Sequence, residues 1–532
     1  MRTDARHAAA PRRAGVITRA AVLAAVALGA PGAATAAAAT GMAGTGPPPP
    51  TPAACAAVRP PRTVAPILAP ARRGSGHGPR VFAMQLEQDP ANVQTYAAFR
   101  RKTECDLRAF VVPHLSRTRP NVVVFDEDIG LMTIGTGSRG AAARALLANP
   151  LGHPGCEGQG FPCATLAALA LVGAGYVRQQ AFYALRFGGV PGLSDTFVAA
   201  TDTFARGWMQ TFSDLARRYR VYLAGSADQP DFAASSAPGD IDALADPDLP
   251  RPQEVYVATS RAVHNKVFVW GPRDVRTGGP PMLRNVVAAN EKVPLTPIEQ
   301  ALGLTPGPAT GPAAVANLRP FRIPHTRARL GFATSLPAFV YGTVAPGADP
   351  CADVSRTYMR CLDHLGANVV LQDEANPGRW TGADGDGVEQ WQPLSWMTST
   401  ARAVTDPSVR FAYDVTPMLV GNLADLAFDG QSAITQRGLR GRGCHYVGNG
   451  TWTAGEDRPD LQDEAGDHPE FLALAPWVTA DAPRAALRAT GARLAPGSGD
   501  VHEGDYVETA LVADLPFPPD PRRAGCRTRP AP

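Results

Sequence analysis

Residues 121–127 read Asn121-Val-Val-Val-Phe-Asp-Glu127, a run of β-branched and aromatic residues that ends in two carboxylic acids. A short apolar run without alternating polar residues is typical of a strand that is buried on both faces. Runs of this kind alternate with stretches of helical pattern along the chain, which predicts an α/β fold. The other predicted strands cover 81–84, 219–223, 267–270, 330–333, 369–371 and 510–512, and the predicted helices cover 93–115, 194–218, 353–365 and 396–405.

The chain begins with the pattern of an export signal. Residues 1–40 contain five arginines and one acid, and the apolar stretch 20–29 is followed by small residues where a signal peptidase could cut. No apolar run reaches the ~18 residues of a membrane-spanning helix. We therefore expect an extracytoplasmic protein, secreted or in the cell envelope. The pair Arg12-Arg13 leaves the twin-arginine and general secretory routes both open.

Composition divides the rest of the chain into three parts. Residues 41–79 are rich in Pro, Gly and Ala, and we expect an extended linker there. Residues 80–516 contain no comparable break and form the predicted folded domain, with an insertion at about 138–200. The apolar run 164–177 in this insertion predicts a buried helix. Residues 517–532 form a tail that is again rich in Pro and Arg.

The charge balance excludes two classes of partner. Outside residues 1–40 the chain has 46 basic and 47 acidic residues. This nearly neutral balance gives no electrostatic footprint for nucleic acid or anionic lipid. The expected partner is therefore a small-molecule substrate, and the sequence leaves open whether the chain forms a homo-oligomer.

The eight cysteines all follow residue 40, and an even count in an exported chain favours disulfides over metal thiolates. The pairs Cys156–Cys163 and Cys351–Cys361 each enclose a short loop and are the pairings that we expect. The ten histidines show no His-x-x-x-His spacing, so no metal is expected. Residues 135–140 match Gly-x-Gly-x-x-Gly, but the acidic residue that a dinucleotide site needs about 20 positions later is missing. No cofactor is expected.

Lysine usage is unusual, because only three of the 51 basic residues are lysines. Arginine cannot replace lysine where a compact ammonium or a movable pKa is needed. Lys102 lies in a charged run, and we interpret it as a chance survivor. Lys292 lies in the segment Asn290-Glu-Lys-Val-Pro-Leu-Thr-Pro-Ile-Glu299 and is the candidate for a chemical role, with Lys266 as its rival.

Three segments in a fixed order carry a family resemblance. The strand 121–127 ends in Glu127, Lys292 is followed by Leu, Pro and then Glu299, and Arg329-Leu-Gly-Phe-Ala-Thr-Ser335 is a short strand that ends in serine. This order resembles the glutamate, lysine and cysteine motifs of the carbon-nitrogen hydrolase (nitrilase) superfamily, with Ser335 at the position of the cysteine. Weaker matches lie at 81–85 with Asn92, at 365–371, at the turn Gly430-Gln-Ser432 and at 508–515, so the resemblance covers most of 81–516.

The resemblance implies a nitrilase-like α-β-β-α sandwich with a long insertion and extra loops. In that family a thiolate attacks an amide or nitrile carbon, a glutamate moves protons and a lysine stabilises the oxyanion. The implied catalytic residues are Glu127, Lys292 and Ser335, with Glu299 as a second carboxylate of the site. The implied activity is amidase-type hydrolysis of a C–N bond other than a peptide bond, in a small amide, nitrile or acyl substrate.

Serine at the nucleophile position changes the chemistry. A hydroxyl is far harder to ionise than a thiol, and a lone carboxylate is a weaker partner than the histidine of a Ser-His-Asp triad. Two other functions therefore stay open beside the hydrolase. One is a catalytically inactive binding protein with the nitrilase fold, and the other is an acyltransferase that uses the same fold.

Overall fold

The computed structural model describes residues 47–58, 62–72, 75–148, 163–377, 392–423, 425–440, 470–477, 484–525 and 527. The chain divides into two units, Met1–Pro48 and Pro49–Pro532, and every element below belongs to the second. The expected signal over 1–40 and Cys156 lie outside the described residues. No helix in the described part is long and apolar enough to cross a membrane.

The first sheet has seven strands in the order β1-β15-β2-β3-β4-β5-β6. Strands β2, β3 and β4 are parallel, β15 is antiparallel to β2, and β4, β5 and β6 form an antiparallel meander. The strands are β1 (Ile67–Ala69), β2 (Arg80–Gln85), β3 (Asn121–Val124), β4 (Tyr222–Ser235), β5 (Val255–Trp270), β6 (Val286–Glu291) and β15 (Thr509–Asp514).

The second sheet has six strands in the order β14-β13-β10-β9-β8-β7, and its strands β8, β9 and β10 are parallel. A separate two-stranded ribbon pairs β11 with β12. The strands are β7 (Phe321–Arg322), β8 (Arg329–Phe332), β9 (Val369–Leu371), β10 (Tyr413–Thr416), β11 (Val420–Leu423), β12 (Leu426–Asp429), β13 (Ala433–Gln436) and β14 (Phe471–Leu474).

Successive residues of the central strands face different hydrophobic clusters. Val122 of β3 packs in one cluster with Leu330 and Val369 of the second sheet, so this cluster lies between the two sheets. The next residue of β3, Val123, belongs to the cluster on the outer face of the first sheet. In β9, Val370 likewise belongs to the cluster outside the second sheet. Both sheets are therefore buried on two faces, as the unbroken apolar runs predicted.

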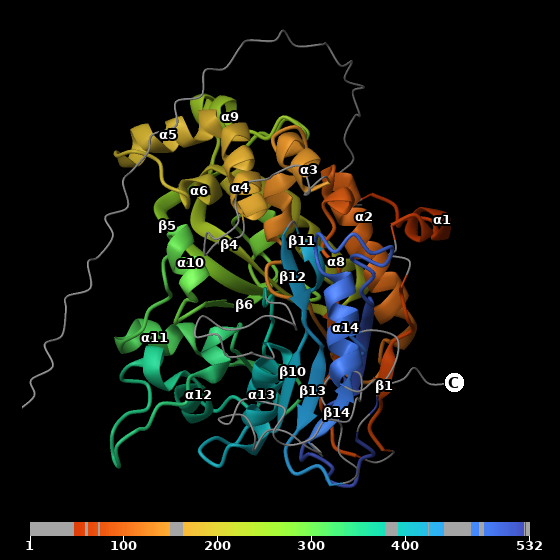
Figure 1. Cartoon of the computed structure of the whole chain (residues 1–532). Coiled ribbons are helices and arrows are strands. Elements are labelled where there is room, and N and C mark those ends of the chain that lie inside the picture. Colours follow the sequence, from red (N-terminus) through yellow and green to blue (C-terminus); the bar gives the residue numbers. More distant parts are fainter. Residues whose placement is uncertain are drawn as a thin grey trace, which may run out of the picture. The chain divides into compact units, whose positions relative to one another are not determined.

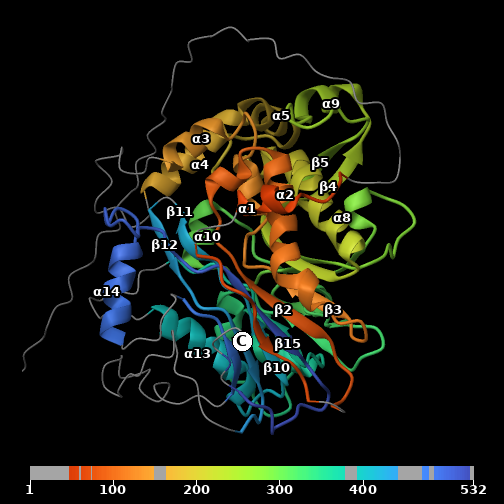
Figure 2. The same ribbon diagram turned by 90° about the vertical axis from the view of Figure 1, so that its right-hand side faces the viewer.

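Helices cover the outer face of each sheet. On the first sheet, Phe99 of α2 (Tyr96–Asp106) and Phe212 of α8 (Gln210–Tyr219) join the cluster that contains Phe82. Figure 2 shows β2 and β15 between α2 on one side and β10 of the second sheet on the other. The order of layers is helix, sheet, sheet, helix, which confirms the predicted α-β-β-α sandwich.

The helical layer on the second sheet contains α12 (Val354–His364) and α13 (Gln392–Thr405). The side chain of Asp353 caps α12 by accepting a hydrogen bond from the Ser355 N–H at 3.1 Å, which satisfies one of the free amides of the first turn. Tyr358 of α12 is buried in the same cluster as Val370. The sequence prediction of a helix over 353–365 is thus confirmed.

The predicted insertion contributes further helices beside the long β4–β5 hairpin (Figure 1). Most of the apolar run 164–177 forms α4, which buries one stripe of residues, Ala164, Ala168 and Val172, and leaves the others partly exposed, so the expected helix is present but only partly buried. The remaining helical elements are α1 (Pro52–Ala56), η1 (Pro90–Val93), η2 (Leu107–Val111), η3 (Val112–His114), η4 (Leu131–Gly135), α3 (Ala141–Leu147), α4 (Cys163–Gly175), α5 (Val177–Phe187), α6 (Asp195–Ala199), α7 (Thr201–Thr203), η6 (Phe204–Met209), α9 (Pro238–Leu244), η7 (Pro281–Leu283), α10 (Pro297–Leu302), α11 (Gly311–Asn317), η8 (Leu336–Phe339) and α14 (Arg484–Leu494).

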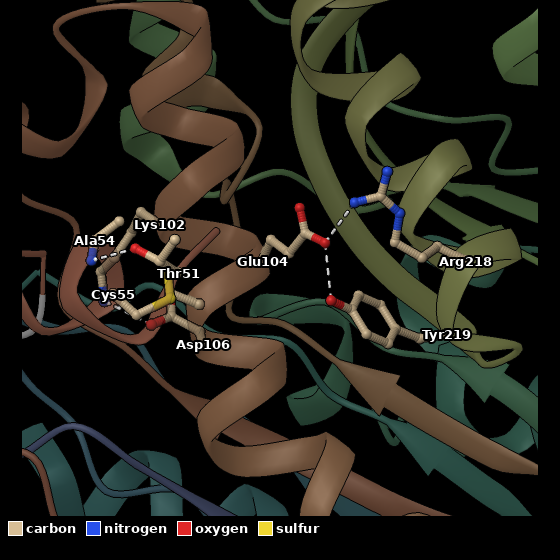
Figure 3. The surroundings of a disulfide bond; sticks show 9 residues. Thr51, Ala54, Cys55, Lys102, Glu104, Asp106, Arg218 and Tyr219 are labelled. Atoms are coloured by element: carbon tan, nitrogen blue, oxygen red, sulfur yellow. Dashed lines mark hydrogen bonds and ion pairs between the residues drawn. A yellow bond between two sulfur atoms is a disulfide. The ribbon is translucent and has the colours of Figure 1, made fainter. Parts of the chain in front are cut away.

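The expectation of an extended linker over 41–79 is wrong at α1 (Pro52–Ala56) and at β1 (Ile67–Ala69). Residues 67–69 form β1, which pairs with β15, and Ile67 is fully buried between the sheets. Farther upstream, Cys55 of α1 is joined by a disulfide to Cys105 of α2 (Figure 3). A three-residue strand inside a Pro-rich stretch gives too short a periodic pattern to be recognised, which is why composition suggested a linker.

The C-terminal tail also packs against the domain. Arg523 is buried and donates to the backbone carbonyls of Asp514 and Ala69, so it connects the tail to β15 and β1. The structure contains a disulfide between Cys351 and Cys361, which was one of the two expected pairings. The other expected pairing involves Cys156, which lies outside the described residues, and it stays a prediction.

Candidate active site

Glu127 lies three residues beyond the end of β3, at the carboxyl edge of the parallel part of the first sheet. Its side chain is almost completely buried. Oε1 accepts hydrogen bonds from Lys292 Nζ and from Asn265 Nδ2, both at 2.7 Å, and Oε2 accepts one from the Ala375 N–H at 3.0 Å. Three donors from three separate parts of the chain therefore fix the position of this carboxylate.

Lys292 follows β6 directly, and its N–H donates to the Asn265 carbonyl of β5 at 2.9 Å. Its ammonium lies 2.7 Å from Glu127 Oε1 and 2.9 Å from Glu299 Oε1. Glu299 belongs to α10 and is held in a capping box, in which its Oε2 accepts from the Thr296 N–H and hydroxyl, each at 2.7 Å. The segment 292–299 thus folds back to place a second carboxylate on the lysine.

Burial and charge act against each other at this pair. Burial raises the pKa of Glu127 to about 7, although the nearby Lys292 ammonium lowers it. Burial alone would lower the pKa of Lys292, but Glu127 and Glu299 together raise it above its ordinary value. For Glu299, burial is outweighed by Lys292 and by the Thr296 hydrogen bonds, so its pKa is lowered. Glu127 is therefore suited to proton transfer near neutral pH, and Lys292 keeps its charge.

Ser335 stands between the end of β8 and the short helix η8, and it is 2% exposed. Its backbone has φ 56° and ψ −118°, a conformation that residues with a side chain rarely adopt. Such a strained residue costs on the order of 1–3 kcal/mol and persists only where the surroundings enforce it. A strained turn between a strand and a helix is also the geometry by which α/β-hydrolases present a nucleophilic serine.

The loop 372–376, which follows β9, connects Ser335 to Glu127. The Ser335 N–H donates to the Asp373 carbonyl at 3.1 Å, and the Ala375 N–H in the same loop donates to Glu127 Oε2 at 3.0 Å. Ser335 Oγ lies 3.4 Å from Asn376 Oδ1. Among the described hydrogen bonds, none joins Ser335 Oγ directly to Glu127 or to Lys292. Ser335 and Glu127 therefore both bind the same short loop, residues 372–376.

Sequence reasoning missed the polar residues of this loop and of β4 and β5. Asp373 accepts hydrogen bonds from the Thr334 hydroxyl at 2.7 Å and the Ser226 hydroxyl at 2.8 Å. Asn265 of β5 bridges Glu127 and Glu299. A signal for the loop was present, because Asp373 and the next residue, Glu374, follow the apolar run 369–371 just as two acids follow β3.

The other two lysines lie in separate ion pairs. Lys266 binds Asp231 at 2.6 Å and Glu291 at 2.7 Å, and no described contact places it against Glu127. Lys102 is buried and binds Asp106 at 3.0 Å and Glu508 at 2.7 Å. The interpretation of Lys102 as a chance survivor is therefore wrong, because a buried ammonium shared by two carboxylates is a specific requirement.

The glycine-rich segment 135–140 forms a turn next to α3. The Arg144 guanidinium donates to the carbonyls of Gly135 and Gly137, and the Ser138 N–H and hydroxyl both donate to Asp248. Within the described residues, no cluster of three or more His, Cys, Asp or Glu side chains is arranged to hold a metal ion.

These elements define an α/β sandwich with a buried glutamate–lysine pair and a strained serine at the carboxyl edges of its sheets. No family model and no curated protein matches the chain. Among solved structures, it is similar to a carbon-nitrogen hydrolase from Helicobacter pylori G27, at 12% identity over 67% of this chain and 82% of that chain with a TM-score of 0.34. It is similar to a variant of the amidase from Nesterenkonia sp. AN1 in complex with butyramide, at 13% identity over 69% and 85% of the two chains with a TM-score of 0.32.

Proposed function

We propose that the chain is an exported amidase-type hydrolase that cleaves a non-peptide C–N bond, with Ser335 as nucleophile, Glu127 as proton carrier and Lys292 as the cation that stabilises the oxyanion. The observation that carries this proposal is the loop 372–376. It holds the strained backbone of Ser335 through Asp373 and holds Glu127 through the Ala375 N–H. The pattern of residues 1–40 and the disulfides of the described chain support export.

In the first half of the reaction, Glu127 takes the proton of the Ser335 hydroxyl while Oγ forms a bond to the amide carbon. The electron pair of the C=O bond moves to oxygen, and the Lys292 ammonium stabilises that negative charge. The C–N bond then breaks as the protonated Glu127 gives its proton to the leaving nitrogen. The products of this half are ammonia or an amine and an ester on Ser335.

In the second half, Glu127 takes a proton from water, and the resulting hydroxide equivalent attacks the ester carbon. The collapse of this second tetrahedral species breaks the bond to Oγ, and the proton on Glu127 returns to Ser335. A carboxylic acid leaves and the site is restored. A pKa of about 7 lets Glu127 both accept and donate a proton near neutral pH.

One observation favours a second candidate function, a catalytically inactive binding protein of the same fold. Ser335 Oγ approaches Asn376 Oδ1 at 3.4 Å, and no described hydrogen bond links it to Glu127. In the hydrolase, the hydroxyl rotates toward Glu127 when substrate binds, since catalytic hydrogen bonds in empty sites are often long. In a binding protein, the hydroxyl stays where it is and no ester forms.

The test uses the secreted protein and two readouts. Incubation with p-nitrophenyl acetate followed by peptide mass spectrometry should give an acetyl adduct on Ser335, and a panel of small amides should release ammonia. Ser335→Ala should abolish both, whereas the exposed control Ser236→Ala should change neither. An inert parent protein together with a Ser335→Cys variant that hydrolyses amides would instead support the inactive binding protein, because Glu127 and Lys292 would then activate a thiol.

A further inference from the structure

Two aspartates lie next to Glu127 without taking part in the chemistry above. Asp128 follows Glu127 directly, has φ 62° and donates its N–H to the Ser226 Oγ of β4 at 2.9 Å. Asp228 lies two residues beyond Ser226 on the same face of β4. Ser226 in turn donates to Asp373, the residue whose carbonyl holds Ser335. The two aspartates therefore belong to the surroundings of the candidate nucleophile.

Asp228 is also paired with a residue that contacts the site. It lies opposite Asn265 in the β4–β5 ladder, and side chains opposite each other on antiparallel strands have Cβ atoms roughly 5 Å apart. The Asn265 Nδ2 donates to Glu127 and Glu299, so these two carboxylates orient the amide. The Oδ1 atom of Asn265 takes part in neither of these hydrogen bonds.

Three buried acceptor atoms in this region have no hydrogen-bond donor among the described residues. They are Oδ1 of Asp128, Oδ1 of Asp228 and Oδ1 of Asn265. Asp228 is 2% exposed, so bulk water does not solvate its side chain. A buried acceptor without a partner is destabilising. Two of these atoms belong to residues that lie opposite each other, Asp228 and Asn265, and a donor-bearing group would complete all three.

The local charge identifies the kind of donor. Burial raises the pKa of Asp128 well above its ordinary value, and the neighbouring Asp228 raises it further. Burial also raises the pKa of Asp228, with Glu299 and Glu127 adding to the effect. The raised pKa means that the neutral, protonated form of each carboxyl is favoured. A ligand group with a positive charge and several N–H donors would favour the ionised form, in which the carboxylate oxygens accept hydrogen bonds.

We propose that Asp128, Asp228 and Asn265 form a subsite that binds the protonated amine of a substrate whose amide carbon lies at Ser335. This inference rests on the proposed function, because it assumes that a substrate occupies the site. An ammonium has three donors and no acceptor, and three acceptor atoms match that number. The substrate class is therefore a small amide with an amino group at the end of its chain.

The probes are matched pairs of amides that differ in one group. A series from 3-aminopropanamide to 6-aminohexanamide carries the cation at increasing distance, and the alkanamide with a methyl group in place of the ammonium is the neutral partner of each. We expect kcat/KM for the best amino-amide to exceed that of its neutral partner by at least about tenfold, since hydrogen bonds to a charged group are stronger than those between neutral groups.

Two variants test whether the aspartates cause this preference. Asp228→Asn and Asp128→Asn keep the shape of each side chain, and each should reduce the ratio of kcat/KM between the two partners by about tenfold. Asp242→Asn is the matched control, because this exposed aspartate of α9 binds Arg178 at the surface. It should leave the ratio unchanged. Thermal unfolding of each variant shows whether it is folded. If one aspartate variant does not fold, the other one tests the preference.

Binding to the Ser335→Ala variant separates failure of the subsite from failure of the hydrolase. Calorimetric titration with the best amino-amide and its neutral partner needs no turnover. Tighter binding of the amino-amide that disappears in Ser335→Ala/Asp228→Asn supports the subsite even if no amide is hydrolysed. Equal binding of the two partners overturns it, as does a preference that both aspartate variants retain. The two carboxyls would then satisfy each other by sharing a proton.

Discussion

Lys292 Nζ lies 2.7 Å from Glu127 Oε1 in an ion pair that is almost completely buried, since only 2% of the lysine side chain and 4% of the glutamate side chain are exposed. Two charges that are this deeply buried stabilise each other, and each becomes costly when the other is removed. Removal of either partner should therefore destabilise the fold and also impair the proposed chemistry. Substitutions can separate these two contributions.

Lys292→Met removes the ammonium and keeps most of the side-chain volume. We expect a loss of about 3–5 kcal/mol in the free energy of unfolding, because Glu127 and Glu299 are left buried without their cation. Amide hydrolysis should fall by about 10²–10³-fold or more, as for the loss of an oxyanion donor. Urea denaturation and ammonia release measure the two effects.

Lys102→Met is the control for that variant, since Lys102 is a buried lysine that also binds two carboxylates. Lys102→Met should lower the free energy of unfolding by a similar amount without a comparable loss of amide hydrolysis. A Lys292→Met protein as stable and as active as the parent would contradict the proposed role of the pair.

The pH dependence of activity follows from Glu127. The base must be ionised to accept the Ser335 proton, so kcat/KM should rise with pH along a limb whose midpoint is about 7. An exposed carboxylate would place that limb near its ordinary value of 4.5. A pH profile between 4 and 9 on a neutral amide distinguishes the two, and a midpoint near 4.5 would show that another group controls the rate.

The free energy of unfolding should fall as the pH rises between 5 and 8. Burial raises the pKa of Glu87 to about 8, that of Asp126 to about 8 and that of Glu127 to about 7. The folded state then holds protons that the unfolded state has lost, so the free energy of unfolding falls as the pH rises through this window. Urea denaturation at pH 5, 6.5 and 8 checks the trend. Glu87→Gln should make it shallower, and a rising trend would contradict it.

The backbone of Ser335 gives a prediction with opposite signs for stability and activity. Glycine tolerates φ 56° and ψ −118°, so Ser335→Gly should relieve strain and raise the free energy of unfolding by about 1 kcal/mol. Ser335→Ala retains the strain and should bring no such gain. Both variants should be inactive. A Ser335→Gly protein less stable than Ser335→Ala would show that the conformation is not strained.

The two described disulfides should differ in what they contribute. Cys55 and Cys105 are 50 residues apart, and Cys351 and Cys361 are 10 apart. If disulfides act by restricting the unfolded chain, paired Cys→Ala variants should lose about 4 and about 3 kcal/mol respectively. Non-reducing peptide mapping should recover both pairs and also the predicted Cys156–Cys163. Free thiols at Cys351 and Cys361 would contradict the structure and weaken the case for export.

Local apolar runs predicted the central strands, and the resemblance to family motifs placed Glu127 and Lys292 in one site, because both kinds of signal lie in a few consecutive residues. The run 122–124 is apolar at every position, and both faces of β3 are buried. Asn265 was not predicted, because the hairpin β4–β5 mixes polar and apolar residues along its length. The ion pair between Lys102 and Glu508 could not be predicted from a local pattern, because the two residues lie 406 positions apart in the sequence.

The position of β15 in the first sheet has a consequence for how the chain is made. It lies between β1 and β2, and it pairs with both. These two strands leave the ribosome before residues 509–514, which lie far downstream of them in the sequence. Strand β15 must therefore insert between two segments that were synthesised before it. A chain that stops short of residue 509 has both flanking strands but nothing to join them.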